Sequence, residues 1–230
     1  MKAMILAAGR GERLRPLTDR TPKPLIDVGG QPLIGHHLRA LAAAGFYDVV
    51  INVAYRAEQI EAALGDGRRY GVRIVYSRET PGELDTGGGI AHALPVLGPA
   101  PFLVISSDVV SDIDYGAVAQ RRAGAEAHLV LVDNPPHHPR GDFGLRGDTI
   151  VETPPRLTYA GVGVFAPHWF AGRDTPRFAL ATVLREAITA DRASGEHHRG
   201  RWIDVGRPSA LAAARQGLRD AGAGGATPQV

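Results

Sequence analysis

The chain has 230 residues, 44% of them hydrophobic and 22% charged, which is enough for one large domain with a sizeable core. The formal net charge of +2 argues against a dedicated nucleic-acid binder, and the absence of cysteine excludes disulfides and thiolate metal sites. Because neither a signal peptide nor a membrane-spanning apolar stretch is recognisable, we expect a cytoplasmic protein that binds neither membrane nor nucleic acid.

The first 133 residues alternate between short apolar runs and amphipathic segments. Strands are predicted at 2–7, 48–54, 72–77, 102–108 and 127–133. Helices are predicted at 33–45, 57–64, 87–94 and 114–123. Buried strands that alternate with helices predict a single-domain α/β fold of the Rossmann-like kind, with a mostly parallel sheet and helices on both faces.

This alternation ends after residue 134. The later elements are predicted as a loop rich in Pro and His (134–142), a hairpin (144–152), a strand (157–165), a helix (178–190), a short strand (201–205) and a final helix (208–221). No shift in composition divides the chain, so we expect one domain over residues 1–220, with the second half adding a lid or substrate pocket. Residues 221–230 are expected to form a disordered tail.

The stretch "LAAGRGERLRP" (6–16) follows the first predicted strand directly. Its glycines allow backbone N–H groups to surround an anion, and three arginines add positive charge. The third glycine of a dinucleotide fingerprint is replaced by Leu14, and a Walker A motif is also missing. The loop therefore predicts phosphate binding of another kind, with a solvated polar connection as the alternative.

A second signal is "TPKP", in which two prolines restrict the backbone around Lys23. Lys23 is also one of only two lysines among 26 basic residues. A compact ammonium group suits a point contact with phosphate. A plain surface turn is the alternative.

Together, "MILAAGRGERLRPLTDRTPKPLIDVGGQPLI" resembles the N-terminal signature of the sugar-1-phosphate nucleotidyltransferases. The resemblance covers about residues 1–215 and implies a fold of the nucleotide-diphospho-sugar transferase type. It implies that Ala8 and Gly9 lie near the base and ribose, and that Gly11, Glu12 and Arg13 surround the phosphates. Arg13 would then neutralise the leaving pyrophosphate, and Lys23 would reach the α-phosphate or the sugar phosphate.

Two aspartates are candidate ligands of Mg²⁺, which prefers carboxylate and phosphate oxygens. Asp108 ends "FLVISSD" and Asp204 lies in "RWIDVGRP", both at positions where the family binds its metal. We predict Arg13, Lys23, Asp108 and Asp204 as the catalytic set. The competing Asp112 and Asp114 are interpreted as caps of the following helix.

The remaining candidates concern the base and the sugar. The segment "ELDTGGGIAHAL" resembles the base-recognition segment of the family, with Gly87 and Gly88 as the candidate contacts. Ser106, Asp142, Glu152 and Thr158 are candidates for sugar binding. Ser106 and Ser107 replace the usual Asn-Gly before the metal aspartate, a change that concerns the sugar more than the chemistry. The histidine pairs at 36–37, 137–138 and 197–198 are interpreted as surface residues.

The resemblance implies attack of a sugar-1-phosphate oxygen on the α-phosphorus of a nucleoside triphosphate. The products would be a nucleoside-diphosphate sugar and pyrophosphate. The first choice of substrates is UTP and the 1-phosphate of N-acetylmuramic acid, in cell-wall recycling. GTP with mannose 1-phosphate, or another such pair, is the alternative. A non-catalytic nucleotide-sugar sensor also remains, although Arg13, Lys23 and both aspartates favour an enzyme. The sequence carries no sign of an oligomeric state.

Overall fold

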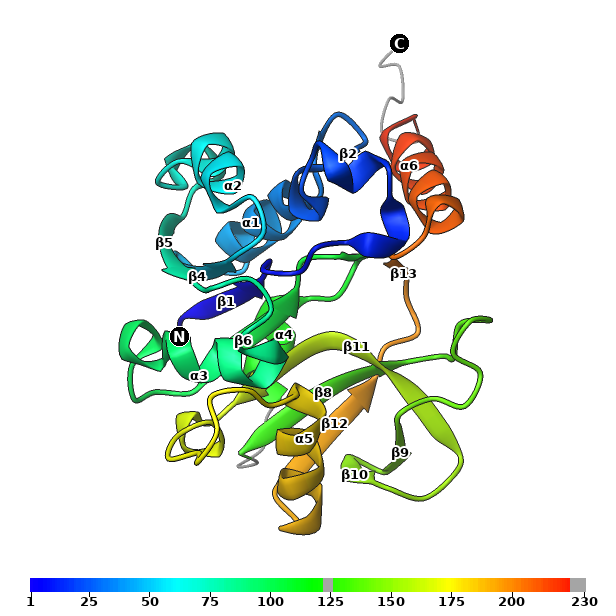
Figure 1. Ribbon diagram of the computed structural model, residues 1–230. Coiled ribbons are helices and arrows are strands. Elements are labelled where there is room, and N and C mark those ends of the chain that lie inside the picture. The colour runs from blue at the N-terminus through cyan, green and yellow to red at the C-terminus, as the bar shows by residue number, and fades with distance from the viewer. Residues whose placement is uncertain (122–125, 224–230) are drawn as a thin grey trace.

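The computed structural model describes residues 1–121 and 126–223, with side chains up to residue 217. Nine strands in these ranges form one sheet, in the order β5-β4-β1-β6-β11-β8-β12-β10-β9 (Figure 1). The strands are β1 Ala3–Leu6, β4 Asp48–Val53, β5 Arg73–Arg78, β6 Phe102–Ser106, β8 Ala127–Val132, β9 Phe143–Arg146, β10 Thr149–Val151, β11 Arg156–Phe165 and β12 Ala193–His197.

The sheet is parallel in its first half and mixed in its second. Strands β5, β4, β1 and β6 pair in parallel, as the alternation of strands and helices predicts. Beyond them, β11 runs antiparallel to β6 and β8, and β12 runs parallel to β8. The apolar runs of β1 and β4 are buried on both faces, which is typical of a parallel sheet covered by helices.

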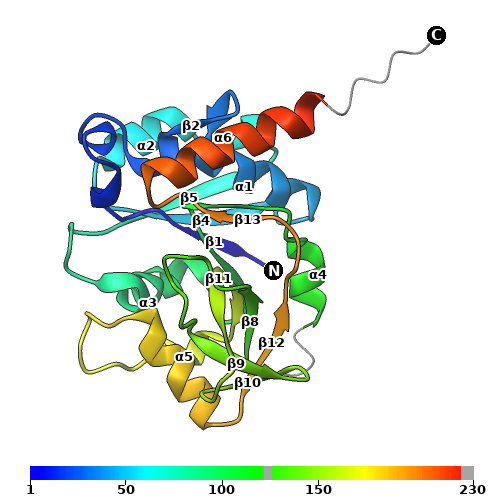
Figure 2. The same ribbon diagram turned by 90° about the vertical axis from the view of Figure 1, so that its right-hand side faces the viewer.

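Helices cover both faces of the sheet. The helices α1 (Leu33–Ala43), α2 (Ala57–Leu64) and α4 (Tyr115–Arg121) pack on one face, and α3 (Asp85–Leu97) and α5 (Leu180–Thr189) on the other. Strand β1 shows the alternation: Ala3 and Ile5 contact the first group, whereas Met4 contacts the second. Figure 2 shows α1 and α2 above β4 and β1, and α3 below them.

A third, smaller core joins the C-terminal part of the chain to the N-terminal loop. Strand β13 (Trp202–Asp204) pairs antiparallel with β7 (Val109–Ser111), and α6 (Pro208–Ala223) packs against β13 and β2 (Asp27–Val28). This core consists of Leu14, Ile26, Val28, Leu33, Val110, Val205, Leu211 and Ala214. The short elements are completed by β3 (Gln31–Pro32) and the 3₁₀ turns Glu12–Leu14, Leu17–Asp19, Lys23–Leu25, Arg68–Tyr70 and Pro167–Trp169.

Several predicted boundaries change. The strand predicted at 102–108 ends at Ser106, and a turn at residues 107–108 separates it from β7. Strand β12 was not predicted, because "ASGEH" lacks the β-branched residues typical of strands. Helix α6 extends to Ala223, so the first three residues of the expected tail are helical, whereas 224–230 lie outside the described residues, as do 122–125 after α4. Within residues 1–121 and 126–223, no helix has the length and apolar character needed to cross a membrane.

Candidate active site

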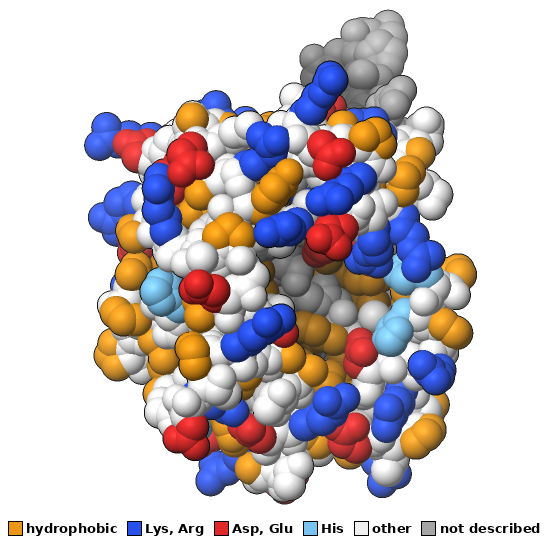
Figure 3. All heavy atoms as spheres, viewed as in Figure 1, with side chains coloured by type: hydrophobic (Ala, Val, Ile, Leu, Met, Phe, Trp, Pro, Cys, Tyr) orange, Lys and Arg blue, Asp and Glu red, His pale blue; other side chains and the backbone are white. Residues whose placement is uncertain are grey.

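A cavity of about 800 Å³ opens beyond the carboxyl ends of β1, β4, β5 and β6. This is the edge at which open α/β sheets bind their ligands. The face shown in Figure 3 is hollowed at its centre, with side chains of both charges around the hollow. Eight of the predicted site residues line the cavity: Ala8, Gly9, Gly11, Glu12, Arg13, Lys23, Ser106 and Asp108.

The loop after β1 depends on the backbone conformation of Gly11. Its φ of +66° lies in the left-handed region, and an added Cβ would lie 2.9 Å from Cγ2 of Thr18 and 3.1 Å from Cβ of Lys23. The carbonyl of Gly11 accepts hydrogen bonds from Oγ1 of Thr18 and from the backbone N–H of Leu14. Only glycine fits this close approach without strain, and the turn places Glu12 and Arg13 on the cavity.

Lys23 is buried against Asp108, so it does not lie in a plain surface turn. Its Nζ donates a hydrogen bond of 2.7 Å to Oδ2 of Asp108. The lysine side chain is 11% exposed and that of the aspartate 33%. An ammonium group removed from water needs such a partner. The stiff "TPKP" segment therefore places the lysine against Asp108, one of the two candidate metal ligands.

Strand pairing brings the two candidate metal ligands together. Asp204 of β13 lies opposite Val109 of β7, and the backbone N–H of Val205 donates to the carbonyl of Asp108 over 2.7 Å. A Cβ added to Gly206 would lie 2.9 Å from Oδ1 of Asp204 and 2.8 Å from a terminal nitrogen of Arg13. The backbone beside Asp204 thus contacts Asp108, and Oδ1 of Asp204 lies near Arg13, although Asp204 itself does not line the cavity.

The pair of carboxylates fits Mg²⁺ better than a metal held by protein alone. In the described ranges, no group of three or more His, Cys, Asp or Glu side chains could hold a metal ion. Mg²⁺ is commonly bound by one or two carboxylates together with substrate phosphates. Of the competing aspartates, Asp114 caps α4 by accepting from the N–H of Ala117, as predicted. Asp112 does not cap the helix, because its Oδ1 lies 2.8 Å from Nε2 of His198.

Gly87 and Gly88, the predicted base contacts, are not among the residues that line the cavity. Their N–H groups donate to the carbonyl of Phe178 at 2.9 and 3.1 Å. A Cβ on Gly88 would lie 2.1 Å from the carbonyl oxygen of Pro176. The glycines therefore admit a segment of the protein itself, and residues 84–86 face the cavity in their place.

Asn52 and Glu79 are among the cavity residues that sequence reasoning missed. Oδ1 of Asn52 accepts from the N–H of Ala7 at 2.9 Å, and its Nδ2 donates to Oε1 of Glu79 at 2.7 Å. Burial raises the pKa of the Glu79 carboxyl above its ordinary value. The one available signal was Asn52 itself, because a polar side chain inside the apolar run "VVINV" must find a partner.

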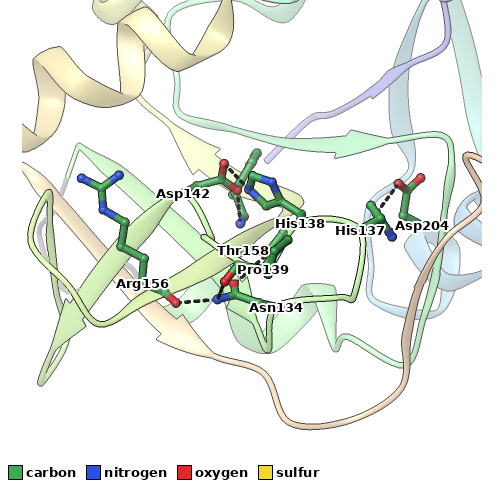
Figure 4. A network of polar contacts seen from close by, with 9 residues as sticks. Asn134, His137, His138, Pro139, Asp142, Arg156, Thr158 and Asp204 are labelled. Carbon is green, nitrogen blue, oxygen red and sulfur yellow. Dashed lines mark hydrogen bonds and ion pairs between the residues drawn. The ribbon is translucent and has the colours of Figure 1, made fainter.

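The predicted sugar residues divide into two groups. Ser106 lines the cavity, and an added Cβ on the adjacent Gly161 would lie 2.7 Å from its Oγ. Asp142, Glu152 and Thr158, the other candidates for sugar binding, are not among the residues that line it. Asp142 and Thr158 hold the loop 134–142 in place (Figure 4), and the carboxylate of Glu152 lies within 3.6 Å of two arginines, Arg156 and Arg185.

The histidine pairs are not uniformly surface residues. His37 is buried, with its Nδ1 lying 2.8 Å from the hydroxyl of Tyr115. Burial lowers the pKa of His37 to about 4. Nε2 of His137 lies 3.5 Å from Oδ2 of Asp204 (Figure 4), at the candidate metal site.

A glycine-containing loop, a buried lysine and Asp108 line a cavity beyond the carboxyl ends of parallel strands, and Asp204 lies on the neighbouring strand β13. This arrangement is typical of a nucleotide-binding α/β protein. The nucleotidyl transferase family matches residues 2–221, so the chain belongs to that family. It is accordingly a nucleotidyltransferase.

Individual relatives agree with this assignment. The chain is 54% identical to an N-acetylmuramate α-1-phosphate uridylyltransferase of Neisseria meningitidis, over 90% of this chain and 93% of the relative. It is 35% identical to a mannose-1-phosphate guanyltransferase of Aspergillus fumigatus, over 90% of this chain but only 61% of that protein. A structure from Bacillus anthracis, assigned as a glucose-1-phosphate thymidylyltransferase, shares the fold with a TM-score of 0.83 at 22% identity, covering 96% of each chain.

Proposed function

We propose that this protein transfers the uridylyl group of UTP to the α-1-phosphate of N-acetylmuramic acid, with Mg²⁺, in the cytoplasm and for the recycling of peptidoglycan. The observation that carries the transfer chemistry is the contact of Lys23 with Asp108 at a cavity that Arg13 also lines. The 54% identity to the uridylyltransferase supports this choice of substrates over GTP and mannose 1-phosphate, for which the relative above is 35% identical.

The loop of residues 9–13 would hold the triphosphate. The cavity volume of about 800 Å³ lies within the usual range of ligand sites. The guanidinium group of Arg13 would neutralise the charge that develops on the departing pyrophosphate. A lysine ammonium has three N–H donors. One of those of Lys23 is directed at Asp108, which leaves donors for phosphate oxygens.

Asp108 and Asp204 would hold the Mg²⁺, which when bound supplies positive charge to the phosphate oxygens of both substrates. In the reaction, an oxygen of the sugar phosphate forms a bond to the α-phosphorus, and the bond from that phosphorus to the β-phosphate oxygen breaks. The attacking phosphate is already ionised, so the chain needs no strong general base. Its side chains act by orientation and by neutralising charge.

The test is pyrophosphate release with Mg²⁺, crossing UTP, GTP, CTP, dTTP and ATP with a panel of sugar 1-phosphates. The panel includes N-acetylmuramic acid α-1-phosphate, N-acetylglucosamine 1-phosphate and mannose 1-phosphate. We expect release with UTP and the first of these sugars, and its loss when the metal is chelated. Release with another pair would replace the substrates. Nucleotide binding without release from any pair would contradict the proposal and favour the sensor.

A further inference from the structure

The loop between β8 and β9, residues 134–142, is fixed at its first residue. Nδ2 of Asn134 donates to the carbonyls of Arg156 (2.9 Å) and Pro139 (3.3 Å), and Oδ1 accepts from Oγ1 of Thr158 (2.8 Å). The amide of Asn134 thus joins the loop both to strand β11 and to its own far side.

The last residue of the loop is fixed as firmly. Oδ2 of Asp142 accepts from the N–H of Tyr159 at 2.8 Å, and Oδ1 lies 3.0 Å from Nε2 of His138. Gly141 has a φ of +59°, and an added Cβ would lie 2.7 Å from Oδ1 of Asn134. The two ends therefore pack against each other, and polar side chains maintain the shape of a loop that carries two histidines.

This bracing places His137 at the candidate metal site (Figure 4). Nε2 of His137 lies 3.5 Å from Oδ2 of Asp204, with the two side chains 28% and 20% exposed. The other oxygen of Asp204, Oδ1, lies beside Gly206, which Arg13 also approaches. Oδ1 of Asp204 is therefore near Arg13, in the loop of residues 9–13, and Oδ2 is near His137.

We propose that His137 is a binding residue for the phosphate group of the sugar 1-phosphate, a conclusion that rests on the proposed function. A nitrogen that reaches one oxygen of Asp204 also reaches an anion placed beside that carboxylate. Arg13 and the loop of residues 9–13 account for the nucleotide phosphates, and His137 comes from the part of the chain that does not line the nucleotide cavity. Besides Lys23 and the metal, a donor that contacts the second phosphate directly would stabilise it between the two aspartates, and the braced loop supplies one.

The experiment compares H137A and H137Q with H168A. His168 is the matched control, because its Nε2 also contacts a carboxylate (Glu126, 3.0 Å) but lies at the opposite end of β8. The KM for each substrate is measured separately. Calorimetry then gives the Kd of N-acetylmuramic acid α-1-phosphate for protein that carries a non-hydrolysable UTP analogue.

For H137A we expect the KM and Kd for the sugar phosphate to rise about ten- to a hundredfold, the usual effect of losing a hydrogen bond to a charged group. The KM for UTP should stay at its wild-type value. H137Q, which keeps an N–H donor, should recover part of the loss, and H168A should behave as wild type. Unchanged sugar-phosphate KM and Kd in H137A would overturn the assignment, as would an equal effect on both substrates.

Failure of the proposed function is distinguishable from failure of this inference. If the wild-type protein binds N-acetylmuramic acid α-1-phosphate but releases no pyrophosphate, the proposed function fails, whereas the calorimetric comparison of H137A with wild type still decides the role of His137. A wild-type protein that does not bind this sugar phosphate contradicts both.

The role of Thr158 in holding the loop of residues 134–142 is tested by T158V. This substitution removes the hydroxyl that donates a hydrogen bond to Oδ1 of Asn134. If Thr158 acts through His137, T158V raises the sugar-phosphate KM in the wild-type background but adds little to H137A. Additive effects would contradict the bracing and indicate that Thr158 contacts the sugar by itself.

Discussion

Replacing Gly206 with alanine inserts one methyl group between two charged side chains of the site. The new Cβ would lie 2.8 Å from a terminal nitrogen of Arg13 and 2.9 Å from Oδ1 of Asp204, where ordinary contacts begin near 3.4 Å. Each atom must therefore retreat by about half an ångström, a step that the ends of flexible side chains can make. Gly206 does not have a positive φ, so alanine adds no backbone strain.

The predicted consequence is a loss of rate with little loss of stability. A displacement of about 1 Å at a reacting group can cost about a hundredfold in rate. Two shifts of half that size should lower kcat by about ten- to a hundredfold. The free energy of unfolding should fall by no more than about 1 kcal/mol, because the methyl group meets side-chain ends and not backbone.

Steady-state pyrophosphate release gives kcat, and urea unfolding gives the free energy. Gly217→Ala is the control, since a Cβ there has nothing within 4 Å and α6 tolerates alanine. Wild-type kcat in folded G206A would refute the placement of Arg13 and Asp204 at the reacting phosphates.

Three further predictions concern other residues of the structure. D108N and D204N should each lower kcat with Mg²⁺ more than about a hundredfold while circular dichroism shows a retained fold, and near wild-type turnover would rule out the metal assignment. G88A should lower the free energy of unfolding in urea by about 1–3 kcal/mol, because its methyl group meets the carbonyl of Pro176 at 2.1 Å; unchanged stability with weaker nucleotide binding would restore a base contact. Burial lowers the pKa of His37 from 6.5 to about 4, so on acidification the unfolded chain binds this proton before the folded protein does. The free energy of unfolding should therefore have its full value above pH 6.5 and fall by up to about 3 kcal/mol towards pH 4. His37→Phe should flatten this slope in urea unfolding followed across that pH range, and an equally steep slope in the variant would contradict it.

The parts of the site that were predictable are those with a local chemical requirement. A loop that wraps phosphates needs glycines and positive charge within a few residues, and "LAAGRGERLRP" shows both. Lys23 was predictable because two prolines restrict its backbone. The parallel half of the sheet was predictable because each buried strand is a compact apolar run followed by a helix.

The remainder depends on contacts between distant segments. The strand character of "ASGEH" comes from pairing with β8, and no property of the five residues indicates it. Glu79 and His137 reach the site only because the chain folds. Glu79 lies 27 residues after its partner Asn52, and His137 lies 67 residues before its partner Asp204. Gly87 and Gly88 do mark a close approach, but glycine does not specify whether a ligand or the protein itself approaches.

Phosphorus-31 NMR of the wild-type protein with UTP, N-acetylmuramic acid α-1-phosphate and Mg²⁺ follows every phosphorus of both substrates in a single sample. We predict that the sugar-phosphate and UTP signals disappear together, and that a UDP-sugar and pyrophosphate appear in equal amounts. Inorganic phosphate with UDP would show cleavage at a different bond. That result, or unchanged spectra, would contradict transfer at the α-phosphorus by Arg13, Lys23, Asp108 and Asp204.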